Sequence, residues 1–494
     1  MTFPNLLLLA SDSATAHVAG STLHAVPGWV TSFYVLVLMA MVLCLAFEEK
    51  LHVKKSLLVG TFAGFCLISE TVIGFFTDRA HPMLPFGAIT LPNGHSLNVP
   101  IFIPAIDWSV ITIILGASLF VEVTSRSGIF TWLAIKLTKR SGGDPWRLLL
   151  FYGGLTVVFS AVLNNVTAMI IIGSLTTVSL SKLQRRDLLL GFLLTEGLLT
   201  NVGGLLTLIS SVPNIIVGQT AGIGFGRFFL VAAPYVLVAS IVTLLQARLT
   251  FGVRSLGTPE EQSAAAEQVA GFDETENVPS ARFFWASVGL LAGFIACLAG
   301  QSALPWDLDE LGMGFVALFF AGTALWIYKH EVDAFYKAVD WDLLGFFASL
   351  FVVIYVMEQA EVLALIGRGI GVMLTLPASV AQGSLLVSAA AASSVTDNIP
   401  LAAVLAKILA VEPTVIGESG SNPASPYWWS VIFGANLGGN ITPIGSASTV
   451  VAMTIIHRQQ LPLTFMGFVK RATPFALVQI SLAVLYVWLY AFFA

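Results

Sequence analysis

Two short polar clusters could bind an ion because each interrupts a long apolar stretch. The first contains Asn164, Asn165 and Thr167, and the second contains Asp397, Asn398 and Pro400. A carboxylate beside amide and hydroxyl oxygens suits Na⁺, and a partly desolvated carboxylate can also take up a proton. We expect a Na⁺ site at Asn165, Asp397 and Asn398, with Asp397 as the coupling residue. The alternative is that Asp397 only caps a half-helix.

A second pair of polar clusters predicts two broken helices. Paired glycines, neighbouring polar residues and a proline let a helix unwind and offer backbone dipoles. Half-helix amino ends favour an anion, whereas unwound carbonyls favour a cation, so an ion and a coupled substrate are both plausible. The alternative is that these residues only pack the breaks. The candidates are Asn201, Gly203, Gly204, Thr207, Pro213 and Asn214, and then Asn436, Gly438, Gly439, Asn440 and Thr442.

The remaining titratable residues limit the kinds of binding or catalytic site that the sequence predicts. Glu196 lies one turn before Asn201 and is interpreted either as a proton relay or as half of an ion pair. Glu122 and Arg126 have the i,i+4 spacing of an ion pair within one helix. Since Lys and Arg are absent beside the motifs in the sequence, an anion would be held by helix dipoles and amides. The seven histidines lack metal-ligand spacing, there is no Walker motif, and no nucleophile–base pair indicates an enzyme.

These clusters must be positioned by membrane helices. The chain has 494 residues, of which 56% are hydrophobic and only 10% charged. Runs such as 28–47 and 56–76 reach the roughly 20 apolar residues that span a bilayer. We therefore expect a multi-pass, all-α protein of the cell inner membrane. Its expected partners include the lipid bilayer but no nucleic acid. The three cysteines lie in apolar runs and indicate no disulfide. The amino-terminal segment lacks a basic region and is expected to be an uncleaved tail.

Basic residues predict the topology. The first 28 residues contain no Lys or Arg, whereas Lys50, Lys54 and Lys55 follow the first span. The amino terminus is therefore expected outside, with residues 77–104 as an outer loop. Basic residues at both ends of 147–186, around the break at Asn164, favour a re-entrant hairpin. Residues 29–76 would be scaffold helices and 107–249 transport elements. Residues 250–281 are expected to be a flexible cytoplasmic linker, and 282–494 the second half.

The two halves are related by sequence register. Asp107 and Asp340 precede matching tryptophans 233 positions apart, and Asn164 and Asp397 have the same separation. Six of eleven residues from Asn201 recur from Asn436, at a separation of 235. Because the linker makes the second half enter from the other side, we expect two inverted repeats of six elements. Each repeat would contain one re-entrant hairpin and one broken helix.

The motifs resemble those of the ion transporter superfamily, in the branch of the P protein, the arsenite and citrate permeases and NhaD-type sodium/proton antiporters. The likeness rests on Thr-Glu-Gly-Leu-Leu-Thr-Asn-Val-Gly-Gly from 195, Asp-Asn-Ile-Pro from 397 and Gly-Ala-Asn-Leu-Gly-Gly-Asn from 434. It implies a scaffold domain, a transport domain, an elevator motion and a homodimer. It also implies paired ion sites at the two hairpin tips and breaks. Two departures remove acids: Asn-Asn at 164–165 where relatives often have Asp-Asn, and Ser-Ser-Val-Pro-Asn at 210–214 where many have Gly-Asp-Pro-Pro-Asn.

The expected function is secondary active transport of a small anion, oxyanion or metalloid hydroxide such as arsenite, coupled to Na⁺ or H⁺ and without another cofactor. The alternative is an NhaD-type Na⁺/H⁺ antiporter that uses Asp397. A channel is a weaker alternative because two hairpins build a closed central site. The sequence indicates neither the substrate nor the direction of transport.

Overall fold

The structure is a computed structural model that describes residues 26–47, 51–76, 87–90, 96–275, 277–300, 308–329, 332–417 and 420–493. The first half contains α1 (Gly28–Ala46), α3 (Lys55–Phe76), β1 (Gly87–Thr90), β2 (Ser96–Val99), α4 (Phe102–Ala105), α5 (Trp108–Ser125), α6 (Ile129–Ser141), α7 (Pro145–Val162), α8 (Asn165–Lys182), η1 (Arg186–Leu188), α9 (Leu189–Gly203), η2 (Leu208–Ser210), α10 (Val212–Ala221) and α11 (Phe225–Thr250). After α12 (Pro259–Ala270), the second half contains α13 (Ala281–Gly300), α14 (Leu308–Ile327), α15 (Val332–Ala338), α16 (Trp341–Gln359), α17 (Val362–Leu374), α18 (Ala378–Ser393), α19 (Asn398–Leu409), α20 (Pro413–Ile416), α21 (Pro426–Gly438), α22 (Ala447–Arg458) and α23 (Phe465–Phe493).

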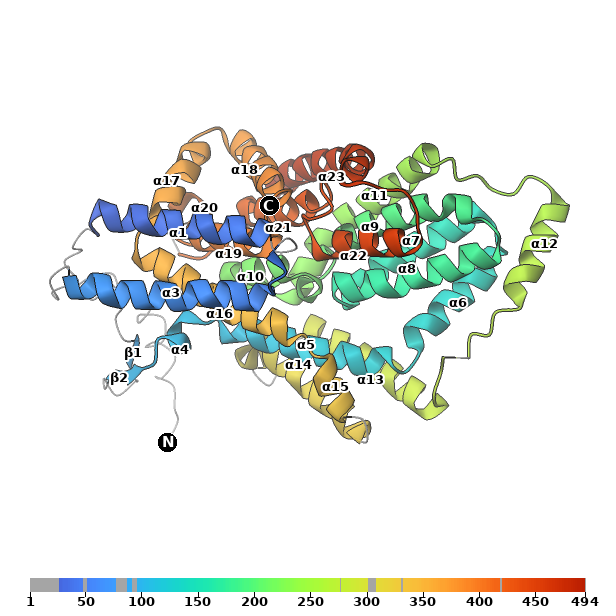
Figure 1. Ribbon diagram of the computed structural model, residues 1–494, viewed down its shortest axis with the longest axis horizontal. Coiled ribbons are helices and arrows are strands. Elements are labelled where there is room, and N and C mark those ends of the chain that lie inside the picture. The colour runs from blue at the N-terminus through green and yellow to red at the C-terminus, as the bar shows by residue number, and fades with distance from the viewer. Residues whose placement is uncertain are drawn as a thin grey trace.

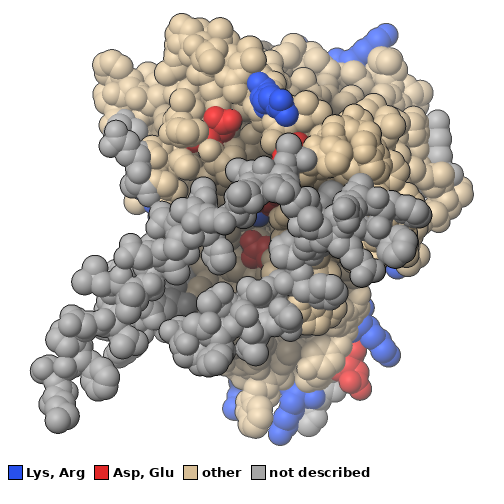
Figure 2. All heavy atoms as spheres, turned by 90° about the vertical axis from the view of Figure 1, so that its left-hand side faces the viewer, with Lys and Arg blue, Asp and Glu red and all other residues tan. Residues whose placement is uncertain are grey.

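The fold-class prediction of a helical membrane protein is confirmed. Eight described helices are long and apolar enough to cross a membrane: α1, α3, α5, α7, α11, α13, α16 and α23. Many of them expose large apolar side chains, for example Leu230 and Leu249 on α11 and Trp285 on α13, as lipid-facing helices do. The surface at the left end of Figure 1 is mainly uncharged where it is described (Figure 2). Most of the predicted amino-terminal tail, and much of the predicted outer loop, lie outside the described residues.

A two-stranded β-hairpin is the exception to the helical architecture of the described residues. β1 and β2 pair antiparallel, with Gly87 opposite Val99 and Thr90 opposite Ser96. Both strands fall within the segment expected to be an irregular outer loop. Figure 1 places them at one end of the long axis, and α12 lies at the other.

A helical hairpin and a helix break lie at each predicted position, and the re-entrance of the hairpins stays a prediction. α7 and α8 form a helical hairpin that turns at Leu163–Asn164, and α18 and α19 form one that turns before Asn398. The first broken helix consists of α9 and α10, and the second of α21 and α22. In Figure 1, α6–α9 extend to one side of the centre and α17–α19 to the other, and residues at both hairpin tips, Asn164 and Asn398, line one cavity.

Helix pairing between the halves is reciprocal. α3 packs on α16 while α14 packs on α5, and α10 packs on α19 while α22 packs on α8. In the order of elements, α3 corresponds to α14, α5 to α16, α8 to α19 and α10 to α22. Such exchanged pairs are what a two-fold relation between repeats produces, and they support the predicted repeat. The orientation of either half in a bilayer remains a prediction.

The predicted linker, residues 250–281, includes a helix that the sequence did not predict. It contains α12, which begins with a capping box formed by Thr258 and Glu261. The chain around α12 also packs against the first hairpin. The side chain of Asp144 accepts a hydrogen bond from the backbone N–H of Leu256 (2.8 Å), and Lys182 lies over the ring of Phe272 at 4.1 Å. Buried apolar residues, among them Val269 and Phe272, anchor this segment, and its role as a cytoplasmic linker stays a prediction.

Candidate functional site

Asn and Asp side chains start the second helix of each hairpin. Asn164 Oδ1 accepts a hydrogen bond from the Thr167 N–H at 2.8 Å, and Asp397 Oδ1 accepts one from the Ile399 N–H at 3.0 Å. Both residues are N-caps, of α8 and α19 respectively. Asp397 is therefore a helix cap, as the alternative interpretation expected, but only through one of its two carboxylate oxygens. The other oxygen remains for a different partner.

Equivalent hydrogen bonds tie each hairpin to its broken helix. The Ser160 hydroxyl donates to Thr200 O (2.7 Å), as Ser393 does to Ala435 O (2.6 Å). Past the first break, Thr207 donates to Ala161 O, and past the second break Thr442 donates to Ser394 O, both at 2.5 Å. Thr207 and Thr442 are therefore structural tethers whose hydroxyls point at hairpin carbonyls.

Asn201 lies at the centre of a buried amide network. Its amide nitrogen donates to Asn440 Oδ1 (2.8 Å) and Ser446 Oγ (2.9 Å), and its oxygen accepts from Ser448 (3.1 Å). Asn165 Nδ2 of the first hairpin approaches the same oxygen at 3.4 Å. Asn201 thus connects the first break to the second break and to the first hairpin tip.

Asn436, at the position equivalent to Asn201, makes a separate bridge. Its nitrogen donates to Asn214 Oδ1 (2.9 Å), and its oxygen accepts from the Ser211 hydroxyl (2.7 Å). Asn214 in turn donates to the carbonyls of Gly204 and Thr207, at 2.7 and 3.0 Å. Asn214 and Asn436 therefore hold the two broken helices together.

The predicted glycines allow close helix contacts. A Cβ on Gly203 would lie 2.7 Å from Val157 Cα, and one on Gly438 would lie 2.8 Å from Ala390 Cα, distances that real side chains do not tolerate. A Cβ on Gly204 would lie 2.7 Å from Asn165 Oδ1, and one on Gly439 would lie 2.9 Å from Gly445 O. These four glycines therefore position the hairpins and breaks rather than hold a ligand with side-chain atoms.

A cavity of about 670 Å³ opens between the two hairpin tips and the scaffold. Six helices begin at its wall: α3, α8, α10, α16, α19 and α22. Of the predicted site residues, Asn164, Asn165, Thr167, Asn201, Pro213 and Asn398 line it. Residues that prediction missed also line it, among them His52, Lys54, Lys55, Ser211, Asp340, Asp342, Ser446 and Ser448. The remaining predicted ion-binding residues are not in the cavity wall; these are Gly203, Gly204, Thr207, Asn214, Asp397, Pro400, Asn436, Gly438, Gly439, Asn440 and Thr442.

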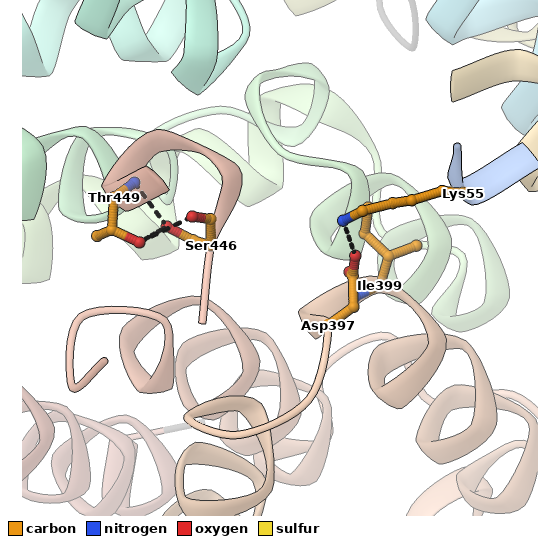
Figure 3. Close-up of polar contacts among 5 residues, drawn as sticks. All are labelled: Lys55, Asp397, Ile399, Ser446 and Thr449. Atoms are coloured by element: carbon orange, nitrogen blue, oxygen red, sulfur yellow. Dashed lines mark hydrogen bonds and ion pairs between the residues drawn. The ribbon is translucent and has the colours of Figure 1, made fainter. Parts of the chain in front are cut away.

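A lysine contacts the key acid. Lys55 Nζ, at the start of α3, lies 2.6 Å from Asp397 Oδ2, and the pair is only partly exposed (Figure 3). Lys54 and Lys55 both line the cavity. The expectation that basic residues are absent near the motifs was therefore wrong, because Lys55 is 342 positions from Asp397 in the chain. The only signal in the sequence was the basic loop itself, which we used solely to assign topology.

Glu196 lies apart from the cavity. It is fully buried in α9, where Oε1 accepts a hydrogen bond from the Thr176 hydroxyl at 2.5 Å and Oε2 has no hydrogen-bond partner among the described residues. A second polar chain lies among the same helices, in which the Tyr152 hydroxyl contacts Thr138 and Ser179 at 2.6 and 2.7 Å. The ion pair that was one interpretation of Glu196 is not found among the described residues. The predicted pair of Glu122 and Arg126 is present at 3.0 Å.

Comparison with known proteins decides the family. The family model described as citrate transporter matches residues 66–434. The chain belongs to this family. An uncharacterized transporter of Mycobacterium bovis is 30% identical over 78% of this chain and 86% of its own length. The human P protein is 24% identical over 77% of this chain and 53% of its own length. The predicted superfamily and branch are thereby confirmed, as is a transporter rather than an enzyme.

Two solved transporters share the fold of this family member. The YdaH transporter of Alcanivorax borkumensis superposes with a TM-score of 0.57 at 16% identity, covering 89% of this chain and 99% of that one. MtrF of Neisseria gonorrhoeae superposes with a TM-score of 0.52 at 15% identity, covering 88% and 94%. At these identities the likeness concerns the fold alone.

Proposed function

We propose that this membrane transporter is a secondary active carrier of a small anion, coupled to Na⁺ or H⁺. The observation that carries the proposal is the convergence of six helix amino ends on one cavity. Each amino end presents unpaired N–H groups and about half a positive charge. Lys54 and Lys55 add positive charge at the same wall. These amino ends and lysines stabilise an anion, while the carboxylates of Asp340 and Asp342 in the same wall can stabilise a cation.

The lysines favour a charged anion within the predicted substrate class. Arsenite is mostly uncharged As(OH)₃ at neutral pH and would gain little from them. A carboxylate or oxyanion would gain charge-assisted hydrogen bonds from the Lys55 ammonium and the Asn165 amide. The family description, citrate transporter, names a substrate of that kind.

The coupling ion is proposed to bind beside the anion. Asn165 and Asn398 contribute amide groups to the cavity wall, and together with Asp397 they remain the proposed Na⁺ ligands. Glu196 remains the proposed proton relay, since a buried acid with an unpartnered oxygen is costly unless it is protonated. The antiporter alternative is less well supported because Lys55 holds the carboxylate of Asp397.

Movement of the hairpins against the scaffold is the proposed mechanism. The cavity separates α3 and α16 from the hairpin tips and breaks. We place α16 with the scaffold because it packs on α3, although its counterpart α5 lies in the segment that the sequence analysis expected to be a transport element. If α3 begins in the cytoplasm, as Lys54 and Lys55 predict, the cavity opens inward. An elevator motion would carry the tips toward the end where α5 begins. A homodimer and an inner-membrane location are part of the same proposal.

Uptake into proteoliposomes tests the function. Radiolabelled citrate, phosphate and arsenite are each offered under an imposed Na⁺ gradient, under a proton gradient and with neither. We expect gradient-driven uptake of a charged anion, faster than arsenite uptake. Proton flux driven by Na⁺ alone, with no anion present, would instead support the antiporter.

A further inference from the structure

The pair formed by Lys55 and Asp397 connects two parts of the protein that the proposed mechanism moves apart. Lys55 begins α3, which packs on α16, whereas Asp397 caps α19 at the tip of the second hairpin. The relative exposures of the two side chains are 32% and 12%. Figure 3 shows the Lys55 side chain extended from α3 toward the hairpin tip.

The first hairpin tip has no comparable charge. Asn164, the equivalent of Asp397, is neutral, and its side-chain oxygen accepts from the Thr167 amide. The second hairpin makes another contact with the scaffold, where Lys407 of α19 lies 3.4 Å from Glu358 of α16. Charge therefore ties the second hairpin to the scaffold at both ends of α19.

Lys55 also borders the space in which an anion would sit. It lines the cavity together with Asn165, Asn398 and Ser446. An anion that enters this cavity meets an ammonium whose carboxylate partner is on a different structural element. The carboxylate and the anion share one ammonium and repel each other as like charges, so binding of the anion weakens the Asp397 contact.

We propose that Lys55 is an anion ligand shared with Asp397, so that the arriving anion takes the ammonium and releases the second hairpin from the scaffold. This inference rests on the proposed function, since it identifies the charged residue of the same site and couples its occupancy to hairpin release. Asp397 keeps its bond to the Ile399 amide when it loses Lys55, and the amino end of α19 continues to stabilise its charge.

Anion affinity in four variants tests the exchange. Citrate and inorganic phosphate are titrated into nanodisc-embedded protein by calorimetry. Asp397→Asn should tighten binding about tenfold because it removes the competitor, and Lys55→Met should weaken it about tenfold or more. With Na⁺ replaced by choline, the double variant should match Lys55→Met, since Asp397 then affects anion binding only through Lys55. Lys139→Met, a matched control whose lysine is similarly exposed and pairs with Glu274 outside the cavity wall, should change affinity by no more than about threefold.

The opposite pattern identifies a merely structural pair. In that case Asp397→Asn and Lys55→Met both weaken binding, and the double variant recovers wild-type affinity. That result overturns the proposal, as does wild-type affinity in both single variants. Either outcome leaves the transport function intact if the wild-type protein still takes up an anion.

A labelling experiment separates the proposal from failure of the proposed function. Val212→Cys places a thiol in the cavity wall, in a background where Cys44, Cys66 and Cys297 are alanine. Citrate should change its labelling rate, and adding Asp397→Asn should give the citrate-like rate without citrate. If uptake shows that no screened anion is carried, the proposed function fails. In that case the proposed hairpin release is refuted only if the Asp397→Asn variant is labelled at the same rate as the wild type.

Discussion

Asn201 and Asn436 should differ in function although they occupy equivalent positions. Both are almost fully buried, and both bridge the two broken helices. Only Asn201 lines the cavity. We therefore expect Asn201→Ala to impair substrate binding and stability, and Asn436→Ala to impair stability alone.

The expected loss of unfolding free energy follows from the hydrogen bonds that each variant removes. Asn201 donates to Asn440 and Ser446 and accepts from Ser448, and Asn436 makes a similar number of bonds. A net hydrogen bond stabilises by about 1 kcal/mol, and a buried partner left unpaired costs about 1–3 kcal/mol. Each variant should therefore lose about 2–4 kcal/mol of unfolding free energy. Asn201 also orients Asn165 and Ser448, which line the cavity, so Asn201→Ala should weaken anion binding about tenfold or more.

Two measurements on the same preparations check this. Denaturant unfolding in detergent gives the change in stability, and calorimetry with the transported anion gives the affinity. Asn436→Ala should bind within about threefold of the wild type because its amide faces Asn214 and Ser211. Equal loss of affinity in the two variants would refute the distinction. So would full stability of either one.

Three further changes have defined outcomes. Gly438→Ala should destabilise by about 1–3 kcal/mol in thermal unfolding through overpacking against α18, whereas Gly154→Ala, which meets open space, should be neutral or stabilising by up to about 1 kcal/mol. Asp144→Ala should cost about 1–2 kcal/mol and speed proteolysis of the linker, because this carboxylate caps α7 and holds Leu256; Asp273→Ala, at an exposed site, should not. Glu196→Gln should keep stability within about 1 kcal/mol but abolish proton-driven uptake in proteoliposomes. Unchanged proton-driven uptake would exclude the relay.

Local backbone chemistry explains why the hairpins and breaks could be predicted. The N–H groups in the first turn of a helix lack backbone partners, and the side-chain oxygen of an Asn or Asp just before the helix accepts a hydrogen bond from one of them. Asn or Asp at the start of an apolar stretch therefore predicts where a helix begins. Asn164 and Asp397 meet that requirement in the structure. Their common separation of 233 positions placed both tips before any contact was known.

The different roles within the motifs could not be read from the repeat. Asn440 bonds to Asn201, to Leu198 O and to Gln479, whereas its equivalent in the first half is Leu205, an apolar residue. The amide network is therefore asymmetric even though the backbone plan is repeated. A motif match assigns Asn201 and Asn436 the same role, but their partners come from helices that differ between the halves.

The place of Lys55 in the site was not predicted because basic residues near helix ends were interpreted only as markers of membrane topology. Basic residues near the ends of membrane helices mark the cytoplasmic side, and Lys54 and Lys55 were used only for that purpose. In this fold α3 and α16 begin at the wall of the cavity. The lysines that mark the side of the membrane therefore also contribute charge to the cavity wall. The acid at one hairpin tip and the lysine at one helix start are then best understood together, as a pair that an anion can separate.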